Sequence, residues 1–512
     1  MKIKFYLIFL LLTGLFLYGL TMRGIYGNPG AKYINENLAG ITMPFELSPE
    51  RGRYALTLAI AEDKTFQLKD EIARMALPDL GYYKGNFFSI FPPGISILVL
   101  PFYLLGKMIN FAQLAVFSVP AIFAVLNSIL IFLILKKFEV RSSYAFIASL
   151  IFSFATTSWS YAVTLYQHHI TTFLILSGFY YVLRFQKYRK LYWIWGLLVW
   201  LNYAVGLVID SPNGLLLLPI MIYFLTSSFE IKIISTQLNI KLKTVIVYTI
   251  IPFLVIGFLY GYYNYSYFGD WFKIRKNLIK VTDIKDGNII SNEDTSVTPQ
   301  KYVLGLFDAK NIPNGLYTLL VSNERGLFYY SPIMALALLG VISAYKKRVR
   351  ETIILVSLIS LNIFLYSAFG DPWGGWAFGP RYLIPSMAIL SIFLGFAYHS
   401  IRSFWFRLIS FPFIIYSVAV ALLGALTTSQ IPPRVEAIPL GIDYTYIRNL
   451  KFLESGQTGS FAYNYFFKNY LSLAQYWLVI FISIVILMSI FLFVAPYLER
   501  RKLYEWSKPK ST

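Results

Sequence analysis

The segment Gln475–Tyr497, QYWLVIFISIVILMSIFLFVAPY, contains no charged residue and is long enough to cross the hydrocarbon core of a bilayer as a helix. Similar apolar runs recur along the chain, in which 57% of the residues are hydrophobic and 14% are charged. The mean hydropathy of +0.60 is above the usual range of soluble domains. The sequence therefore predicts an all-α polytopic membrane protein.

The apolar runs predict about twelve transmembrane helices. The expected spans are residues 4–22, 111–135, 142–160, 168–185, 191–209, 212–227, 244–264, 327–344, 352–368, 382–398, 404–426 and 475–497. Residues 94–108 are also apolar, but this segment is short and contains Pro101 and Gly106, so we expect it to lie on the membrane surface. The basic clusters between spans then fall on the side of Lys2 and Lys4. By the positive-inside rule, this is a multi-pass plasma-membrane protein with both termini in the cytoplasm.

Composition also limits the chemistry. The net charge is +20, but the basic residues form short clusters between apolar runs, which argues against a nucleic-acid partner. The chain has no cysteine, so disulfides, thiolate metal ligands and thiol nucleophiles are excluded. His168 and His169 are neighbours that point apart on a helix, and no H-E-x-x-H pattern exists. We therefore predict no metal ligands and no cofactor, and leave an assisting divalent cation open.

The long first outer loop, residues 23–110, contains the best candidate for a catalytic base. The stretch SPERGRYALTLAIAEDKTF, Ser48–Phe66, predicts a surface helix that begins at Ser48 and Pro49. Glu50 lies in its first turn, where we expect a carboxylate near the water boundary that stays ionised and accepts a proton. The alternative is that Glu50 only complements the helix dipole.

A second surface helix is predicted to follow Pro92-Pro93 at the end of GYYKGNFFSIFPPG, residues 81–94. Asp79 precedes this stretch. It either orients a substrate or serves the turn chemistry of the loop.

Further ionisable residues recur at the outer ends of the predicted helices. Charges at the membrane rim are candidates for function, although a residue at a helix end can also simply reach water. Arginine forks bind phosphate oxygens, which suits a lipid-phosphate substrate. These rim residues are His168, His169, Asp210, Arg325, Asp371 and Arg381.

The order of these motifs resembles the GT-C superfamily of membrane glycosyltransferases, which includes protein O-mannosyltransferases and the lipid A aminoarabinose transferase. Glu50-Arg51-Gly52-Arg53-Tyr54 resembles the acidic D-E-x-R-Y motif of that superfamily, with Arg51 at the position of the second acid. Pro92-Pro93-Gly94 resembles the start of its second surface helix. NERGLFYYSP, residues 323–332, and FGPRYL, residues 378–383, are similar to its outer-end motifs.

The resemblance implies a GT-C-like fold and an inverting transfer of a sugar from a polyprenyl-phosphate donor at the extracytoplasmic face. It implies that Glu50 is the catalytic base, alone or together with Asp79 or Asp63. The acceptor, a protein, a lipid or a glycan, stays open. The implied substrate-binding residues are Arg53, Tyr54, Asp79, His168, His169, Asp210, Arg325, Asp371 and Arg381.

We expect residues 1–426 to form the transmembrane catalytic domain, including loop 23–110. Residues 427–512 would add an outer loop, the last transmembrane helix and a basic tail. The rival hypothesis is a transporter or flippase of a lipid-linked glycan. Such transporters commonly show paired halves and helices broken at the midplane, and neither is evident in the sequence.

Overall fold

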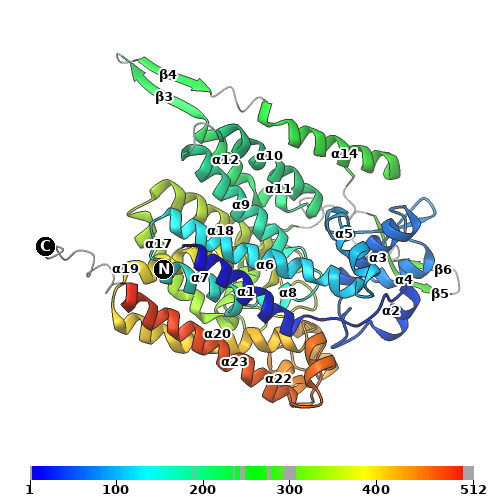
Figure 1. Cartoon of the computed structure of the whole chain (residues 1–512). Coiled ribbons are helices and arrows are strands. Elements are labelled where there is room, and N and C mark those ends of the chain that lie inside the picture. Colours follow the sequence, from blue (N-terminus) through cyan, green and yellow to red (C-terminus); the bar gives the residue numbers. More distant parts are fainter. Residues whose placement is uncertain are drawn as a thin grey trace.

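The computed structural model describes residues 3–187, 191–234, 237–242, 248–273, 278–285, 288–291 and 307–499. Within these ranges, seven helices are long and apolar enough to cross a membrane (Figure 1). They are α1 (Ile3–Thr21), α6 (Ala112–Lys137), α10 (Tyr192–Ile209), α18 (Val349–Ser367), α19 (Ile384–Ser400) with the turn before it, α20 (Phe404–Leu426) and α23 (Leu473–Ser489) with its continuation to Glu499. The chain is thus a multi-pass, mostly helical membrane protein.

Shorter or less apolar helices complete the bundle. They are α7 (Ser142–Phe154), α8 (Ser158–Ala162), α9 (His168–Lys187), α11 (Asn213–Leu216), α12 (Leu218–Ser227), α14 (Ile251–Phe268), α16 (Leu327–Tyr330) and α17 (Ala337–Tyr345). Each predicted span coincides with one or more helices, except that the beginning of span 244–264 lies outside the described residues. The number of crossings stays a prediction. The predicted basic tail beyond Glu499 also lies outside the described residues.

Helix α19 lies at the centre of the bundle and packs against α6, α7, α9 and α17. Its contact with α17 is very close at Gly340, where an added Cβ would lie 1.7 Å from the carbonyl oxygen of Phe393. Small residues at such crossings let the two backbones approach each other, which is how helices associate where lipid removes the hydrophobic driving force.

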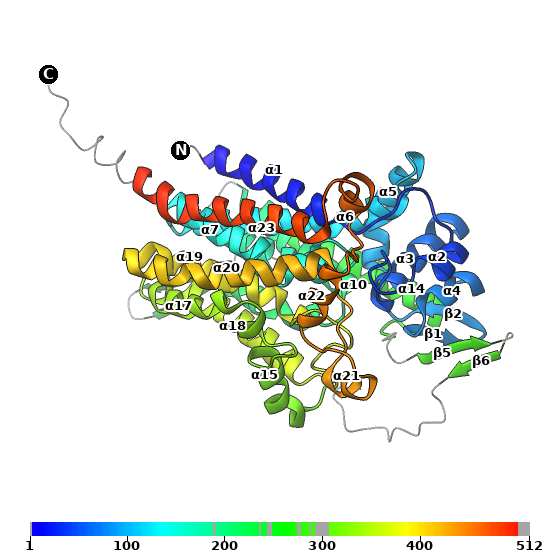
Figure 2. The ribbon, with the colours of Figure 1, turned by 90° about the horizontal axis from the view of Figure 1, so that it is seen from below.

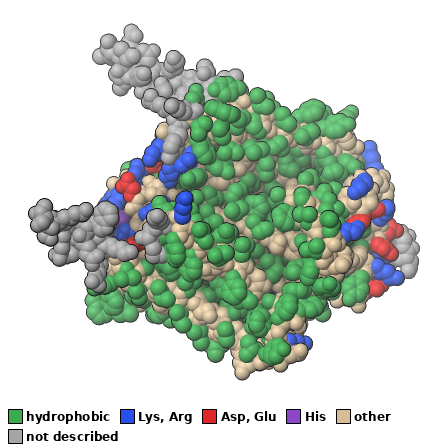
Figure 3. Space-filling view, in the orientation of Figure 1, with side chains coloured by type: hydrophobic (Ala, Val, Ile, Leu, Met, Phe, Trp, Pro, Cys, Tyr) green, Lys and Arg blue, Asp and Glu red, His purple; other side chains and the backbone are tan. Residues whose placement is uncertain are grey.

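The bundle has two distinct ends. The beginning of α1 and the end of α23 lie at one end, and α2 (Ala31–Asn37), α3 (Ser48–Leu58) and α4 (Asp70–Ala76) lie at the other (Figure 2). Hydrophobic side chains cover the middle of the surface, and charged side chains gather towards the two ends (Figure 3). This distribution is typical of a protein whose middle is surrounded by lipid. We refer to the end that carries α3 as the outer end.

The first outer loop is more elaborate than predicted. The two expected surface helices are present: α3 begins at Ser48, and α5 (Gly94–Met108) begins directly after Pro93. The loop also contains α2, α4 and a π-helical turn, Ala59–Asp63. Residues 94–108 therefore form a helix that lies with α3 at the outer end (Figure 1). That this helix lies on the membrane surface stays a prediction.

The all-α assignment needs a correction, because the structure contains two small antiparallel sheets. Strands β1 (Leu80–Tyr83), β2 (Asn86–Ser89), β5 (Ile279–Lys285) and β6 (Asn288–Ser291) form a sheet in the order β2-β1-β5-β6. In it, Leu80 pairs with both Ser89 and Val281, so the sheet joins the first outer loop to the segment after α14 (Ile251–Phe268). A separate hairpin contains β3 (Phe229–Ile234) and β4 (Gln237–Leu242).

The remaining outer elements are α15 (Ile312–Leu320), α21 (Arg434–Leu440) and α22 (Ile447–Glu454). The loop that carries α21 and α22 is tied to the end of α1. The amide of Phe461 donates to the carbonyl of Met22 at 2.8 Å, and the amide of Gly24 donates to the carbonyl of Gly459 at 3.2 Å. The first and third outer loops are therefore packed together at the outer end.

Candidate functional site

A small polar cavity of about 70 Å³ opens at the outer end of the bundle. Its walls come mainly from α3, from the turn before α9, from the ends of α10 and α18, and from the turn before α19. Four of the predicted site residues, Arg53, His168, Asp210 and Arg381, line this cavity. The other lining residues are Pro49, Phe91, Tyr166, Gln167, Pro212, Phe307, Tyr366, Phe369 and Tyr382.

Arg53 is buried and held in a fixed orientation. It donates to the carbonyl of Pro49 at 2.8 Å and to Oε1 of Gln167 at 2.6 Å, and its guanidinium lies 4.4 Å from the ring centre of Phe91. Burial lowers the pKa of Arg53 to about 10, while nearby Asp210 acts to raise it. Arg53 therefore remains a cation at neutral pH.

Asp210 is the carboxylate that lines the cavity. It ends α10, is only 9% exposed and accepts a hydrogen bond from Nε2 of Gln167 at 3.2 Å. Gln167 thus forms hydrogen bonds to both Arg53 and Asp210 and bridges the two charged groups.

Arg381 is far from Arg53 in the sequence but lines the same cavity. It donates to the hydroxyl of Tyr166 at 3.3 Å and to the carbonyl of Gly374 at 2.6 Å. The rings of Tyr166 and Tyr382 lie 5.3 and 5.4 Å from its guanidinium carbon. The ring of His168 stacks on that of Tyr166, with the ring centres 5.7 Å apart. Aromatic groups therefore surround the cationic end of the cavity.

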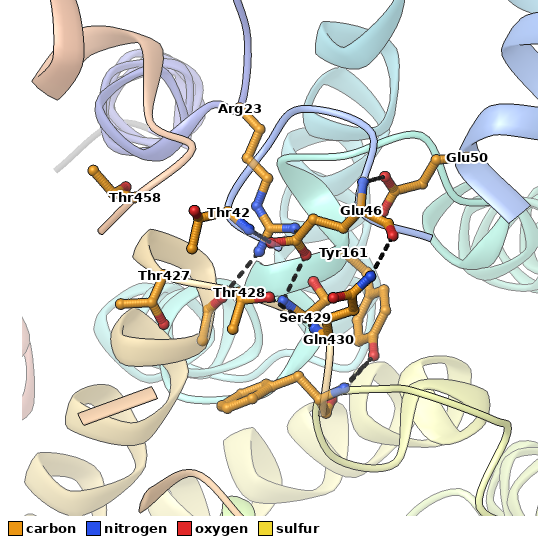
Figure 4. Close-up of polar contacts among 12 residues, drawn as sticks. Arg23, Thr42, Glu46, Glu50, Tyr161, Thr427, Thr428, Ser429, Gln430 and Thr458 are labelled. Carbon is orange, nitrogen blue, oxygen red and sulfur yellow. Dashed lines mark hydrogen bonds and ion pairs between the residues drawn. The ribbon is translucent and has the colours of Figure 1, made fainter. Parts of the chain in front are cut away.

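Glu50 does not line this cavity, and its expected position at the water boundary is wrong. Its side chain is fully buried beneath the first turn of α3, next to the cavity residue Pro49. One oxygen, Oε2, accepts the backbone N–H of Glu46 at 3.0 Å (Figure 4). The other oxygen, Oε1, has no hydrogen-bond partner among the residues that the structure describes. Burial raises the pKa of Glu50 to about 7, with a further increase from the charge of Glu46 and a decrease from Arg23.

Tyr54 and His169 are buried away from the cavity. Tyr54 packs against Phe45 and Tyr103, with ring centres 4.9 and 6.0 Å apart. Nε2 of His169 lies 2.8 Å from the carbonyl oxygen of Ser158. Neither side chain faces the cavity.

Asp79 also lies outside the cavity lining. It accepts a hydrogen bond from Ser48 at 2.6 Å, at the beginning of α3, and forms an ion pair with Lys280 at 3.4 Å. Asp63 pairs with Lys69 at a different part of the outer surface. The structure therefore places neither carboxylate beside Glu50.

Arg325 and Asp371 shape the loop that carries Arg381. The buried guanidinium of Arg325 donates to the carbonyls of Trp373, Gly375 and Ile431 at 3.0, 3.1 and 2.9 Å. Asp371 accepts the backbone N–H of Gly374 at 2.9 Å. Burial raises the pKa of Asp371, and Arg381 opposes that increase. These contacts hold residues 371–375 against the cavity.

Several residues of the site were not predicted. Tyr166 and Gln167 directly precede the two histidines in sequence, and Tyr382 follows Arg381 in the motif FGPRYL, residues 378–383. Glu46 lies four residues before Glu50, and Arg23 lies just after the first span. Their closeness in sequence to predicted residues or to a predicted span is the feature that could have indicated them. Among the described residues, no group of three or more His, Asp or Glu side chains could hold a metal ion.

The fold and the site define a multi-pass helical membrane protein with a charged cavity at its outer end. Two crystal structures of ArnT from Cupriavidus metallidurans, one in the apo state and one bound to undecaprenyl phosphate, are similar to this chain. For the apo structure the identity is 13%, over 96% of this chain and 77% of that chain, with a TM-score of 0.49. For the bound structure the identity is 14%, over 96% and 78%, with a TM-score of 0.47. No family model and no curated protein matches the chain.

Proposed function

We propose that the protein is a membrane glycosyltransferase of the GT-C type. It transfers a sugar from a polyprenyl-phosphate donor to an acceptor at the extracytoplasmic face, with inversion at the anomeric carbon. The observation that carries the proposal is the convergence of Arg53 and Arg381 on one cavity at the outer end. The two residues are far apart in sequence, and only the fold brings them together.

The two arginines lack a counter-charge in direct contact. Their hydrogen-bond partners are neutral, namely Gln167, Tyr166 and backbone carbonyls, and neither forms an ion pair within the described part of the chain. Buried cations without a paired anion are costly unless a ligand supplies one. A phosphate matches the guanidinium fork in shape and charge, so we assign the phosphate of the donor to this cavity.

A lipid-linked donor is also supported by an apolar groove of about 490 Å³ beside the cavity. The groove lies between α10 and α14, and Ser211 and Pro92 on its wall are next in sequence to the cavity residues Asp210, Pro212 and Phe91. Its other walls are mainly apolar, including Leu207, Phe253, Leu254, Phe258 and Trp271. An isoprenoid chain buried there would leave its phosphate at the two arginines.

In the proposed reaction, an acceptor oxygen attacks the anomeric carbon as the bond from that carbon to the phosphate oxygen breaks. Polyprenyl phosphate leaves, and Arg53 and Arg381 stabilise its negative charge. Glu50 is buried next to the cavity residue Pro49 and does not line the cavity, so this scheme requires the acceptor to reach its carboxyl. Glu50 then takes the acceptor proton, and a carboxyl with a pKa of about 7 is suited to this role at neutral pH. Asp210 orients the acceptor or the sugar. Because the donor is already activated by its phosphate, no organic cofactor is needed.

Incubation of native membranes, with and without the protein, with a radiolabelled polyprenyl-phosphate sugar tests the proposal. We expect label to move from the polyprenyl phosphate to an acceptor of the native membrane, a protein, a lipid or a glycan, only when the protein is present. A flippase would move labelled donor across the bilayer and leave the sugar on its lipid. That second result would overturn the transferase proposal.

We also propose that both termini are cytoplasmic and that the site is extracytoplasmic. The absence of native cysteine makes single-cysteine labelling direct. We expect Lys69→Cys and Lys451→Cys, whose side chains are 71% and 68% exposed, to react with an impermeant maleimide in intact cells. Arg402→Cys, in the exposed turn between α19 and α20, should react only after permeabilisation. Labelling of all three from outside would contradict this topology.

A further inference from the structure

A buried ion pair lies beside Glu50. Arg23 follows the end of α1, and its Nη1 contacts Oε2 of Glu46, with both side chains fully buried (Figure 4). The other terminal nitrogen of Arg23, Nη2, donates to the carbonyl of Gly424, near the end of α20, at 3.3 Å. The pair therefore links the outer ends of two membrane helices to the first outer loop.

Glu46 is fixed by the third outer loop as well as by Arg23. Its Oε2 accepts the backbone N–H of Ser429 at 2.8 Å, and its carbonyl accepts Nε2 of Gln430 at 2.6 Å. Its Oε1 accepts the backbone N–H of Thr42 at 3.3 Å. Both the carboxylate and the peptide group of Glu46 thus have their orientation set by distant parts of the chain (Figure 4).

The backbone N–H of the same residue holds Glu50. This N–H belongs to the preceding peptide group, that of Phe45 and Glu46, whose carbonyl accepts the backbone N–H of Gly40 at 3.3 Å. The backbone N–H of Glu46 is the donor to Oε2 of Glu50. A hydrogen bond from a backbone whose position is determined at several points restricts the rotation of the acceptor carboxyl. Within the described part of the chain, the other oxygen, Oε1, has no hydrogen-bond partner, so it is the oxygen that would receive a proton.

The same pair sets the electrostatic environment of Glu50. The charged and titratable groups that face its carboxyl are Glu46, Arg23, Arg51 on the same helix, and Tyr166 before α9. After burial, the charge of Glu46 is the largest influence and raises the pKa of Glu50, while the charge of Arg23 lowers it by less. Thr164 also lowers this pKa, although its hydroxyl completes no hydrogen bond to Oε1.

We propose that Arg23 and Glu46 are positioning residues for Glu50, which fix the direction of its carboxyl through the backbone N–H of Glu46 and its charge through the buried ion pair. This inference rests on the proposed function, because it assumes that Glu50 accepts a proton during turnover. Neither residue touches a substrate in this scheme. Their effect reaches the reaction only through Glu50.

The charge effect is tested by the pH dependence of sugar transfer. Because the base works when deprotonated, the rate of the wild type should fall as the pH drops through about 7. Glu46→Gln removes the neighbouring negative charge and leaves Arg23 in place, so the pKa of Glu50 falls and this acid limb moves to lower pH by about one unit. The double variant Arg23→Gln/Glu46→Gln should move the limb in the same direction but less, since Glu46 has the larger influence.

The orientation effect is tested by a variant without a charge change. Gln430→Ala removes the hydrogen bond to the Glu46 carbonyl, so we expect the plateau rate to fall by about tenfold with the acid limb unmoved. Arg23→Lys keeps the cation and should keep the limb of the wild type. As a matched control, Lys451→Gln/Asp443→Asn removes an outer ion pair of 2.6 Å and should change neither the limb nor the plateau.

A purely structural pair would lower the rate at all pH values and leave the limb in place in Glu46→Gln and in the double variant, and that result would overturn the inference. The pKa of Glu50 can also be measured directly by infrared titration of its carboxyl in vesicles without any donor, with Glu50→Gln to assign the signal. This measurement does not depend on turnover, and a partial loss of folded protein does not shift it. If that titration shifts as expected but neither the wild type nor any variant transfers sugar, the positioning stands and the proposed function fails. If sugar is transferred and the Glu50 titration is the same in every variant, the positioning fails alone.

Discussion

Replacing Glu50 by glutamine is expected to lower the rate of sugar transfer by about 100-fold or more, because a positioned general base contributes that much to such a step. The substitution keeps the size of the side chain. It also keeps an oxygen that can accept the backbone N–H of Glu46, so the fold should persist. The measurement is transfer from a radiolabelled polyprenyl-phosphate sugar in vesicles, together with thermal unfolding in detergent to show that the variant is folded.

The matched control for this prediction is Glu71→Gln. Glu71 lies in the same outer loop, on α4, and is exposed, so its loss should leave the rate close to that of the wild type. Wild-type activity in Glu50→Gln would move the role of base to another carboxylate. Asp210 would then be the first candidate, because it lines the cavity and Glu50 does not.

Replacing Arg381 by alanine is the second large effect we expect, with kcat/KM lower by about 100-fold or more. The guanidinium would stabilise the charge that develops on the departing phosphate, in a buried site where such interactions are strong. Arg381→Lys should recover part of the rate, because a lysine keeps the charge but cannot offer the planar fork. Steady-state transfer at varied donor concentration gives kcat and KM separately.

Two controls separate catalysis from structure here. Arg381 also donates to the carbonyl of Gly374, so thermal unfolding must be measured for each variant. Arg434→Ala removes an exposed arginine of the third outer loop that contacts the ring of Tyr444, and it should behave like the wild type. If Arg381→Ala bound and transferred the donor normally, the phosphate would have to be held by Arg53 alone or outside this cavity.

Local sequence rules located the beginnings of two outer helices, α3 and α5. Proline fits the first turn of a helix, and both α3 and α5 begin where Pro49 and Pro93 indicated. The sheet was missed because its central pairing joins Leu80 to Val281, and no local pattern reports a partner so distant in the chain. The pairing of the outer loops could therefore be found only in the structure.

The candidate site also combines features that the sequence could indicate with features that only the structure revealed. Rim charges at helix ends could be recognised one by one, but their sequence positions could not tell which ones share a cavity. Arg53, His168, Asp210 and Arg381 do so, whereas Arg325 is used to hold the loop beside them. Arg23 and Glu46 were missed because each looked like an ordinary charge next to a span or a helix.

The sequence by itself determined that this chain is a multi-pass membrane protein with acidic and basic residues at the outer ends of its helices. It could do so because transfer of a segment into lipid depends on that segment's own length and composition. Only the tertiary structure decided that Glu50 is buried, which charges surround it and which arginines meet at the cavity. Desolvation and Coulomb interactions depend on distances between segments that the chain order does not contain.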